Sequence, residues 1–99
     1  MTTSPGTEDF VGPVLEAGEA ALAVITAIQA LNPATEVLDR GAYLRVRVPR
    51  RCVVTRAAIE SSLGRPFLLP GDLECLMPAF QGRFHISEEE AVWSFEETR

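Results

Sequence analysis

The sequence contains no lysine and is poor in the residues that build metal and redox sites. All nine basic residues are arginine, and the chain has two cysteines, Cys52 and Cys75, and one histidine, His85. A structural zinc site needs four cysteine or histidine ligands at paired spacings, which three scattered residues cannot supply. Phosphate-binding glycine loops, zinc-protease motifs and EF-hand loops are also absent. These absences argue against an enzyme without excluding one.

We expect neither a leader nor a membrane span. Residues 1–9 consist mainly of threonine, serine, proline, glycine and acid, which predicts a flexible tail and not a signal peptide. The longest mostly apolar run, residues 20–31, is too short to cross a bilayer and is interrupted by Thr26 and Gln29. We therefore expect a cytoplasmic protein with reduced thiols and a single domain over residues 10–99.

Charge is segregated along the chain. Residues 1–39 carry a net charge of −6, residues 40–65 carry +6, and residues 66–99 carry −5, which gives the total of −5. An acidic protein has no excess of cations to neutralise phosphate, so we expect no nucleic acid partner. The central arginines permit a basic patch, although the simpler explanation is a strand and turns solvated by arginine.

The first third of the chain predicts a strand and a helix. Residues 10–15 are apolar but contain Gly12-Pro13, and proline cannot donate to a ladder, so we expect an edge strand or an extended lead-in. Residues 19–31 have apolar side chains at helical spacing, with an acid at the start and Asn32-Pro33 at the end. This is the clearest helix in the sequence.

The middle of the chain changes to a period of two. Residues 36–38, 43–48 and 52–55 read as short strands joined by tight connections, which predicts an antiparallel meander. In the second of them Tyr43 and the arginines that follow it alternate with apolar residues, so one face is polar. Thr55 then caps a predicted helix over residues 56–63.

The last third is less regular. We predict an irregular segment with one turn of helix over residues 67–80, because Pro70, Gly71 and Pro78 interrupt it. Residues 82–86 and 91–95 read as two strands, with a helix beginning at Ser87 as the alternative. The order strand, helix, three strands, helix, two strands predicts an α+β fold, a two-layer sandwich of an antiparallel sheet and two main helices.

Side chains that could catalyse a reaction lie in unpromising places. Cys52 opens a predicted buried strand and Cys75 lies in an apolar run, where thiols usually act as small hydrophobic groups. His85 lies in a strand and is more simply a structural histidine. What remains is the surface around Tyr43 and its neighbouring arginines, residue types that often anchor interfaces. The residues alone thus indicate a binding module.

Several short runs occur together in one order along residues 11–95. The most specific are Asp39-Arg40-Gly41-Ala42-Tyr43 and Leu63-Gly64-Arg65-Pro66-Phe67; the others are Val11-Gly12-Pro13-Val14, Ala17-Gly18, Asn32-Pro33, Thr55-Arg56, Leu73-Glu74, Phe80-Gln81-Gly82 and Trp93-Ser94-Phe95. This order resembles the effector (coupling or regulatory) proteins of bacterial soluble diiron multicomponent monooxygenases, closest to the toluene and aromatic monooxygenase branch.

The resemblance implies a small protein without a cofactor that is not itself an enzyme. Members of this family dock on the diiron hydroxylase component and alter oxygen activation, electron-transfer coupling, substrate access and regioselectivity. A reductase or ferredoxin component is expected to compete for an overlapping surface, and the free effector is expected to be a monomer. The α+β fold of the family agrees with the predicted order of elements.

The resemblance and the turn positions also suggest which residues contact the hydroxylase. The simpler explanation of the turn residues is that they only shape the chain, and Phe80 could belong to the core. The candidate contacts are Asn32, Pro33, Asp39, Arg40, Tyr43, Arg45, Arg65 and Phe80.

Two other classes of function remain open from the residues. A small-molecule-binding regulatory domain also suits an α+β fold of this size, and it predicts a deep apolar pocket. A small thiol or carboxylate enzyme would depend on Cys52, Cys75 or His85.

Overall fold

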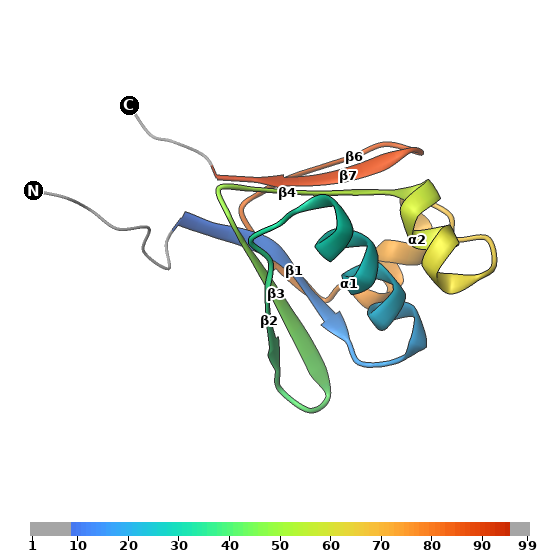
Figure 1. Cartoon of the computed structure of the whole chain (residues 1–99), viewed down its shortest axis with the longest axis horizontal. Helices are drawn as coiled ribbons and strands as arrows, with labels where there is room; N and C mark the ends of the chain where they lie inside the picture. Colours follow the sequence, from blue (N-terminus) through green and yellow to red (C-terminus); the bar gives the residue numbers. More distant parts are fainter. Residues whose placement is uncertain (1–8, 96–99) are drawn as a thin grey trace, which may run out of the picture.

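The computed structural model describes residues 9–95, and its strands form two antiparallel sheets (Figure 1). One sheet has the order β2-β3-β1-β5 and the other the order β4-β7-β6. The α+β class and the antiparallel pairing are confirmed, while most of the predicted tail lies outside the described residues. The elements are β1 (Phe10–Glu16), α1 (Glu19–Leu31), β2 (Glu36–Asp39), β3 (Tyr43–Pro49), β4 (Arg51–Thr55), α2 (Arg56–Leu63), α3 (Gly71–Leu76), β5 (Ala79–Gln81), β6 (Arg83–Ile86) and β7 (Glu90–Ser94).

Helix α1 has the bounds that its sequence predicts. Its apolar stripe is buried, and the helix packs against both α2 and β4. Figure 1 shows all three helices on the same side of the β2-β3-β1-β5 sheet. The core between the sheets and the helices contains the fully buried side chains of Leu15, Ile28, Ile59, Leu73 and Trp93.

Strand β1 is central, so the predicted edge position is wrong. It pairs with β3 on one side and with β5 on the other. The register with β3 runs from Phe10 opposite Pro49 to Glu16 opposite Tyr43. It is interrupted between Val11 and Val14, where Gly12 and Pro13 form no ladder pair with β3. A proline has no amide hydrogen to donate. Because Pro13 lies in this gap of the β1–β3 ladder, no amide donor toward β3 is needed at its position.

The predicted meander of three strands is also wrong in its last strand. β2 and β3 pair as predicted, but β4 pairs with β7 in the other sheet. Only Arg50 separates β3 from β4, and its φ of 68° places it in the left-handed region. A single residue in this conformation turns the chain without reversing it, so β4 leaves the plane of β3 instead of folding back on it.

The segment over residues 67–80 contains more structure than the sequence predicts. The expected turn of helix is α3, but β5 was missed because it has only three residues and follows Pro78. Helix α2 is confirmed with both of its caps: Ala58 N donates to Thr55 Oγ1 at 3.1 Å, and Gly64 has a φ of 82°.

The two predicted C-terminal strands form a hairpin, β6 and β7, and the alternative helix beginning at Ser87 is wrong. Ser87 Oγ accepts hydrogen bonds from Glu89 N at 3.2 Å and Glu90 N at 3.3 Å. Its amide donates to Glu90 O at 2.9 Å. The serine that could have capped a helix therefore closes the hairpin turn instead.

Asn32 protects the edge of the second sheet. Its side chain is only 6% exposed, and its amide nitrogen donates to Val53 O at 2.8 Å while its oxygen accepts from Val53 N at 3.1 Å. The side chain thus occupies the place of a neighbouring strand beside β4 and satisfies both backbone groups of Val53. It also donates to Ile28 O at 2.7 Å, which ties the end of α1 to the same edge.

Replacing Gly12 with alanine is expected to lower the free energy of unfolding by about 3 kcal/mol or more. A Cβ at this position would lie 2.4 Å from the carbonyl oxygen of Val46, and φ is 143°. Gly41→Ala is the matched control, because φ is also positive, at 81°, but no atom lies within 4 Å. Urea unfolding gives the free energy of unfolding of both variants. Equal losses of stability in the two variants would contradict the close approach of Gly12 to the Val46 carbonyl.

Replacing Asn32 with alanine is expected to lower the free energy of unfolding by about 2–4 kcal/mol, because the backbone amide and carbonyl of Val53 lose their hydrogen-bond partner at a part-buried site. Gln29→Ala, at an exposed position on α1, is the control and should change stability little. Thermal and urea unfolding are the measurements. A loss as small as that of the control would show that the Asn32 hydrogen bonds do not stabilise the edge.

Candidate functional site

The described residues provide no arrangement for side-chain catalysis. Burial raises the pKa of the Cys52 thiol to about 12, so this cysteine is neutral and unreactive near pH 7. Cys75 is exposed on α3, and His85 is exposed on β6. Within residues 9–95 there is no group of three or more histidine, cysteine or acidic side chains that could hold a metal ion, and no helix long and apolar enough to cross a membrane.

The most prominent surface is the side of the β2-β3-β1-β5 sheet that no helix covers (Figure 1). On β3 the side chains alternate as predicted, with Leu44, Val46 and Val48 buried on the helix side. The register then identifies which residues of the neighbouring strands share the opposite side. We call this side the outer sheet face; it comprises Phe10, Val14, Leu38, Tyr43, Arg45, Arg47, Ala79 and Gln81.

The two arginines of the outer sheet face are held in place by their neighbours. Arg45 Nη2 donates to Gln81 Oε1 at 2.8 Å, across β1. Arg47 lies 3.4 Å from Glu36 Oε1, and its guanidinium carbon is 4.3 Å from the centre of the Phe10 ring. The Arg47 side chain is consequently only 16% exposed. Ordered side chains lose little conformational freedom on binding, which favours their use in an interface.

The composition of the outer sheet face is that of a protein interface. Its centre has half-buried apolar side chains and arginines, the exposed Tyr43 lies at one end, and the acids Glu16 and Glu36 are exposed at its edges. Interfaces are enriched in tyrosine, phenylalanine and arginine at their centre and are polar at the rim. The arrangement suits docking against another protein better than any reaction.

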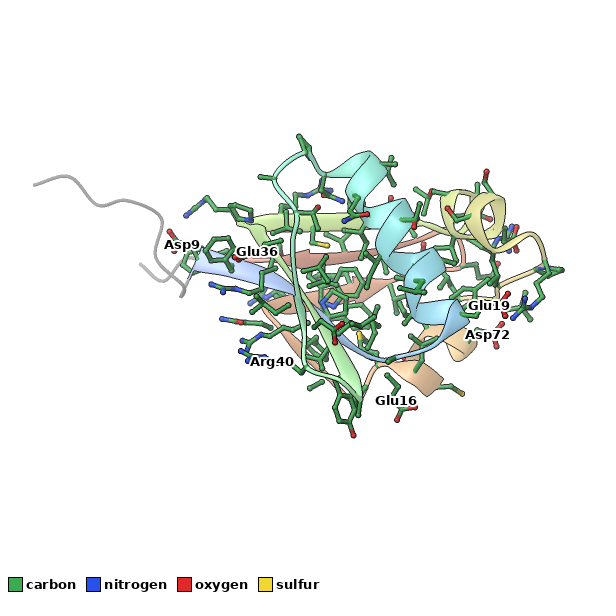
Figure 2. The ribbon with its side chains drawn as sticks, turned by 60° about the horizontal axis from the view of Figure 1, so that its bottom comes forward. Asp9, Glu16, Glu19, Glu36, Arg40 and Asp72 are labelled. Carbon is green, nitrogen blue, oxygen red and sulfur yellow. The ribbon has the colours of Figure 1, made fainter. Side chains whose placement is uncertain are left out.

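Four of the predicted contact residues lie on this face or at its end. Tyr43 and Arg45 belong to it, and Asp39 and Arg40 form the turn that leads into β3. Asp39 Oδ1 accepts from Gly41 N at 2.8 Å, and Arg40 N donates to Tyr43 O at 2.8 Å. In Figure 2 Arg40 lies at the opposite end of the molecule from Glu19 and Asp72.

The other four predicted contacts are not part of the outer sheet face. Asn32 is inside the fold, so its prediction as a contact is corrected to a structural role. Pro33 is exposed in the loop before β2. Arg65 is exposed beside Glu19, with Arg65 Nη2 3.4 Å from Glu19 Oε1 at the far end of the molecule (Figure 2). Phe80 is on β5 but pairs with Pro13 in register, so it faces the opposite side.

Several residues of the outer sheet face were not predicted as contacts. Arg47 is on the face that the alternation predicts, with Tyr43 and Arg45, but it was not included among the predicted contacts. The remaining members, Phe10, Val14, Leu38, Ala79 and Gln81, come from strands whose neighbours are not evident from the sequence. Only the observed register brings them together.

A groove lies between α1 and α2. It has a volume of about 660 Å³ and is lined by Gly18, Glu19, Leu22, Ala23, Thr26, Ser62 and Leu63. The Leu22 side chain is 59% exposed, which shows that the groove is open and shallow. It therefore lacks the enclosure of a small-molecule site, and it does not favour the alternative of a ligand-binding regulatory domain.

Comparison with known proteins identifies a family and a close relative in sequence. A model of the MmoB/DmpM family matches residues 9–94. The effector subunit of the alkene monooxygenase system of Xanthobacter autotrophicus is 46% identical over 90 residues, which are 89% of this chain and 88% of that protein.

Solved structures show the same fold. The regulatory protein fold in a phenol hydroxylase–regulatory protein complex superposes with a TM-score of 0.77 at 17% identity, covering 88% of this chain and 98% of that chain. The regulatory protein B of soluble methane monooxygenase gives a TM-score of 0.67 at 20% identity, covering 97% of this chain and 71% of that chain.

The family match extends from the residue before β1 to the end of β7. It agrees with the runs that the sequence shares with monooxygenase effector proteins, so the predicted resemblance is confirmed. The chain belongs to the MmoB/DmpM family.

Proposed function

We propose that the chain is the effector component of a multicomponent monooxygenase and binds the diiron hydroxylase of that system. The observation that carries this proposal is the 46% identity to an alkene monooxygenase effector subunit over nearly the whole of both chains. The absence of a catalytic or metal-binding group among residues 9–95 is consistent with a regulatory component. The same relative supports an alkene-type system, alongside the aromatic type suggested by the sequence runs.

The hydroxylase binds at the outer sheet face in this proposal. The preorganised Arg45 and Arg47 and the exposed Tyr43 are the side chains best suited to anchor it. The turn that holds Asp39 and Arg40 extends the same surface. Pro33 and Arg65 lie elsewhere and are not part of the proposed interface.

A protein with no reacting group acts on an enzyme only through binding. It shifts the conformational equilibrium of the hydroxylase toward the conformation that it binds more tightly. The size of the shift equals the difference between its binding free energies for the two conformations. The effector thereby changes oxygen activation, the coupling of electron delivery to product, and substrate access at a site that it does not touch. The reductase or ferredoxin component competes for an overlapping surface, and the free effector is a cytoplasmic monomer.

Adding the purified protein to its hydroxylase, reductase and electron carrier is expected to raise turnover or coupling, with saturation near one effector per hydroxylase active site. The physical reason is that only the bound hydroxylase is shifted to the competent state. Steady-state product formation against oxygen uptake measures both quantities. Unchanged turnover and coupling with the cognate hydroxylase would contradict the proposed function.

Tyr43→Ala is expected to weaken hydroxylase binding by about 1–3 kcal/mol while leaving the fold intact, because the side chain is exposed on the outer sheet face. Leu31→Ala is the matched control: Leu31 is 42% exposed and Tyr43 is 43% exposed, but Leu31 lies on α1. Calorimetric titration with the hydroxylase gives both affinities. If the two variants bind equally well, the outer sheet face is not the docking surface.

A further inference from the structure

Phe80 is an exposed aromatic side chain with unusually firm support. Its side chain is 46% exposed on β5, yet its ring centre lies 5.1 Å from that of Phe84 on β6. Phe84 in turn stacks on Trp93 at 5.2 Å with an angle of 28° between the rings, and Trp93 is fully buried. A row of three rings therefore connects the surface to the core, and it holds the Phe80 ring in one position.

The stretch of sequence around Phe80 carries no charge. Residues 75–82 contain no acidic or basic side chain, although almost a quarter of the whole chain is charged. Pro78, Ala79 and Gly82 beside it are exposed and small. Depletion of charge around a rigid aromatic side chain is the composition found at the centre of protein interfaces, where water is excluded.

The position of Phe80 is continuous with the proposed docking surface. β5 is the edge strand next to β1, and Ala79 and Gln81 on either side of Phe80 belong to the outer sheet face. The hydrogen bond between Gln81 and Arg45 fixes β5 to the arginines of β3. The Phe80 ring itself lies on the opposite side of β5 from this face. Because β5 is an edge strand, a partner that covers the outer sheet face and extends around its β5 edge reaches the ring.

The other exposed apolar side chains lack this support. Leu22 and Leu68 are each 59% exposed, on α1 and in the segment before α3, and neither is a ring that could stack. Leucine is also under-represented among the residues that dominate binding energy, while large, rigid aromatic side chains pay little entropy on binding. Phe80 is thus the best preorganised apolar anchor among the described residues.

We propose that Phe80 is the apolar anchor of the interface and that its ring inserts into an uncharged, apolar recess on the hydroxylase. This inference rests on the proposed function. The uncharged β5 and its flanks match a neutral surface, so the recess is lined by apolar side chains and its binding of the ring does not depend on ionic strength. The arginines of the outer sheet face supply the salt-dependent part of the affinity.

The test compares Phe80→Ala with Leu68→Ala, a more exposed apolar side chain outside the proposed interface. Calorimetry gives the affinity of each full-length variant and the wild-type chain for the cognate hydroxylase, at low and at high salt. Phe80→Ala is expected to weaken binding by about 30-fold at both salt concentrations. Leu68→Ala is expected to bind within about twofold of wild type.

A second variant controls for a loss of folding in Phe80→Ala. Phe80→Leu keeps an apolar side chain of similar volume but removes the ring, and it is expected to weaken binding by about 5-fold or more. Thermal unfolding of each variant shows that the fold is retained.

The outcomes separate the two proposals. If the wild-type chain binds the hydroxylase and Phe80→Ala and Phe80→Leu bind as well as Leu68→Ala, the anchor is overturned and the proposed function stands. A loss in the Phe80 variants that disappears at high salt also overturns the apolar recess. If the wild-type chain does not bind the hydroxylase at all, the proposed function fails and the anchor fails with it.

Discussion

At Arg50 the chain passes from the first sheet to the second through a single residue, and the backbone conformation of that residue sets where the second sheet begins. Arg50 has a φ of 68°, its amide donates to Asp9 O at 2.8 Å, and its carbonyl accepts from Phe95 N at 2.8 Å. These bonds fix the start of β1 and the end of β7 to the corner between β3 and β4. Because the chain turns there without reversing, β4 builds a second sheet, and the space between the two sheets becomes the site of α1 and the core (Figure 1).

This arrangement leaves the outer sheet face uncovered. The helices fill the inner side, and the side chains on the outer side are stabilised by one another: Arg45 by Gln81, and Arg47 by Glu36 and Phe10. The exposed edge of β4, in contrast, is closed by Asn32, which prevents that edge from pairing with another chain. The fold thus closes one edge of its second sheet while it keeps one broad face of its first sheet available to a partner.

A regulatory protein of this kind does its work with surface geometry alone. Cys52, the most perturbed titratable group, is a neutral thiol in the core, and the charged residues of the outer sheet face are paired or at its rim. In the proposed role, its influence on the hydroxylase comes from complementarity to one of the conformations of that partner. A rigid surface discriminates between such conformations better than a mobile one, which is why the ordered arginines and the ring row beneath Phe80 matter.

The sequence by itself determined most of the elements and the faces of the clearest ones. The bounds of α1, the caps of α2 and the alternation along β3 follow from local chemistry, and so does the expectation that Tyr43 and Arg45 share a face. The tertiary structure decided which strands are neighbours: the central position of β1, the transfer of β4 to the second sheet, the existence of β5 and the burial of Asn32. These depend on contacts between residues far apart in the chain, such as Asn32 with Val53 and Arg45 with Gln81, which no local pattern encodes.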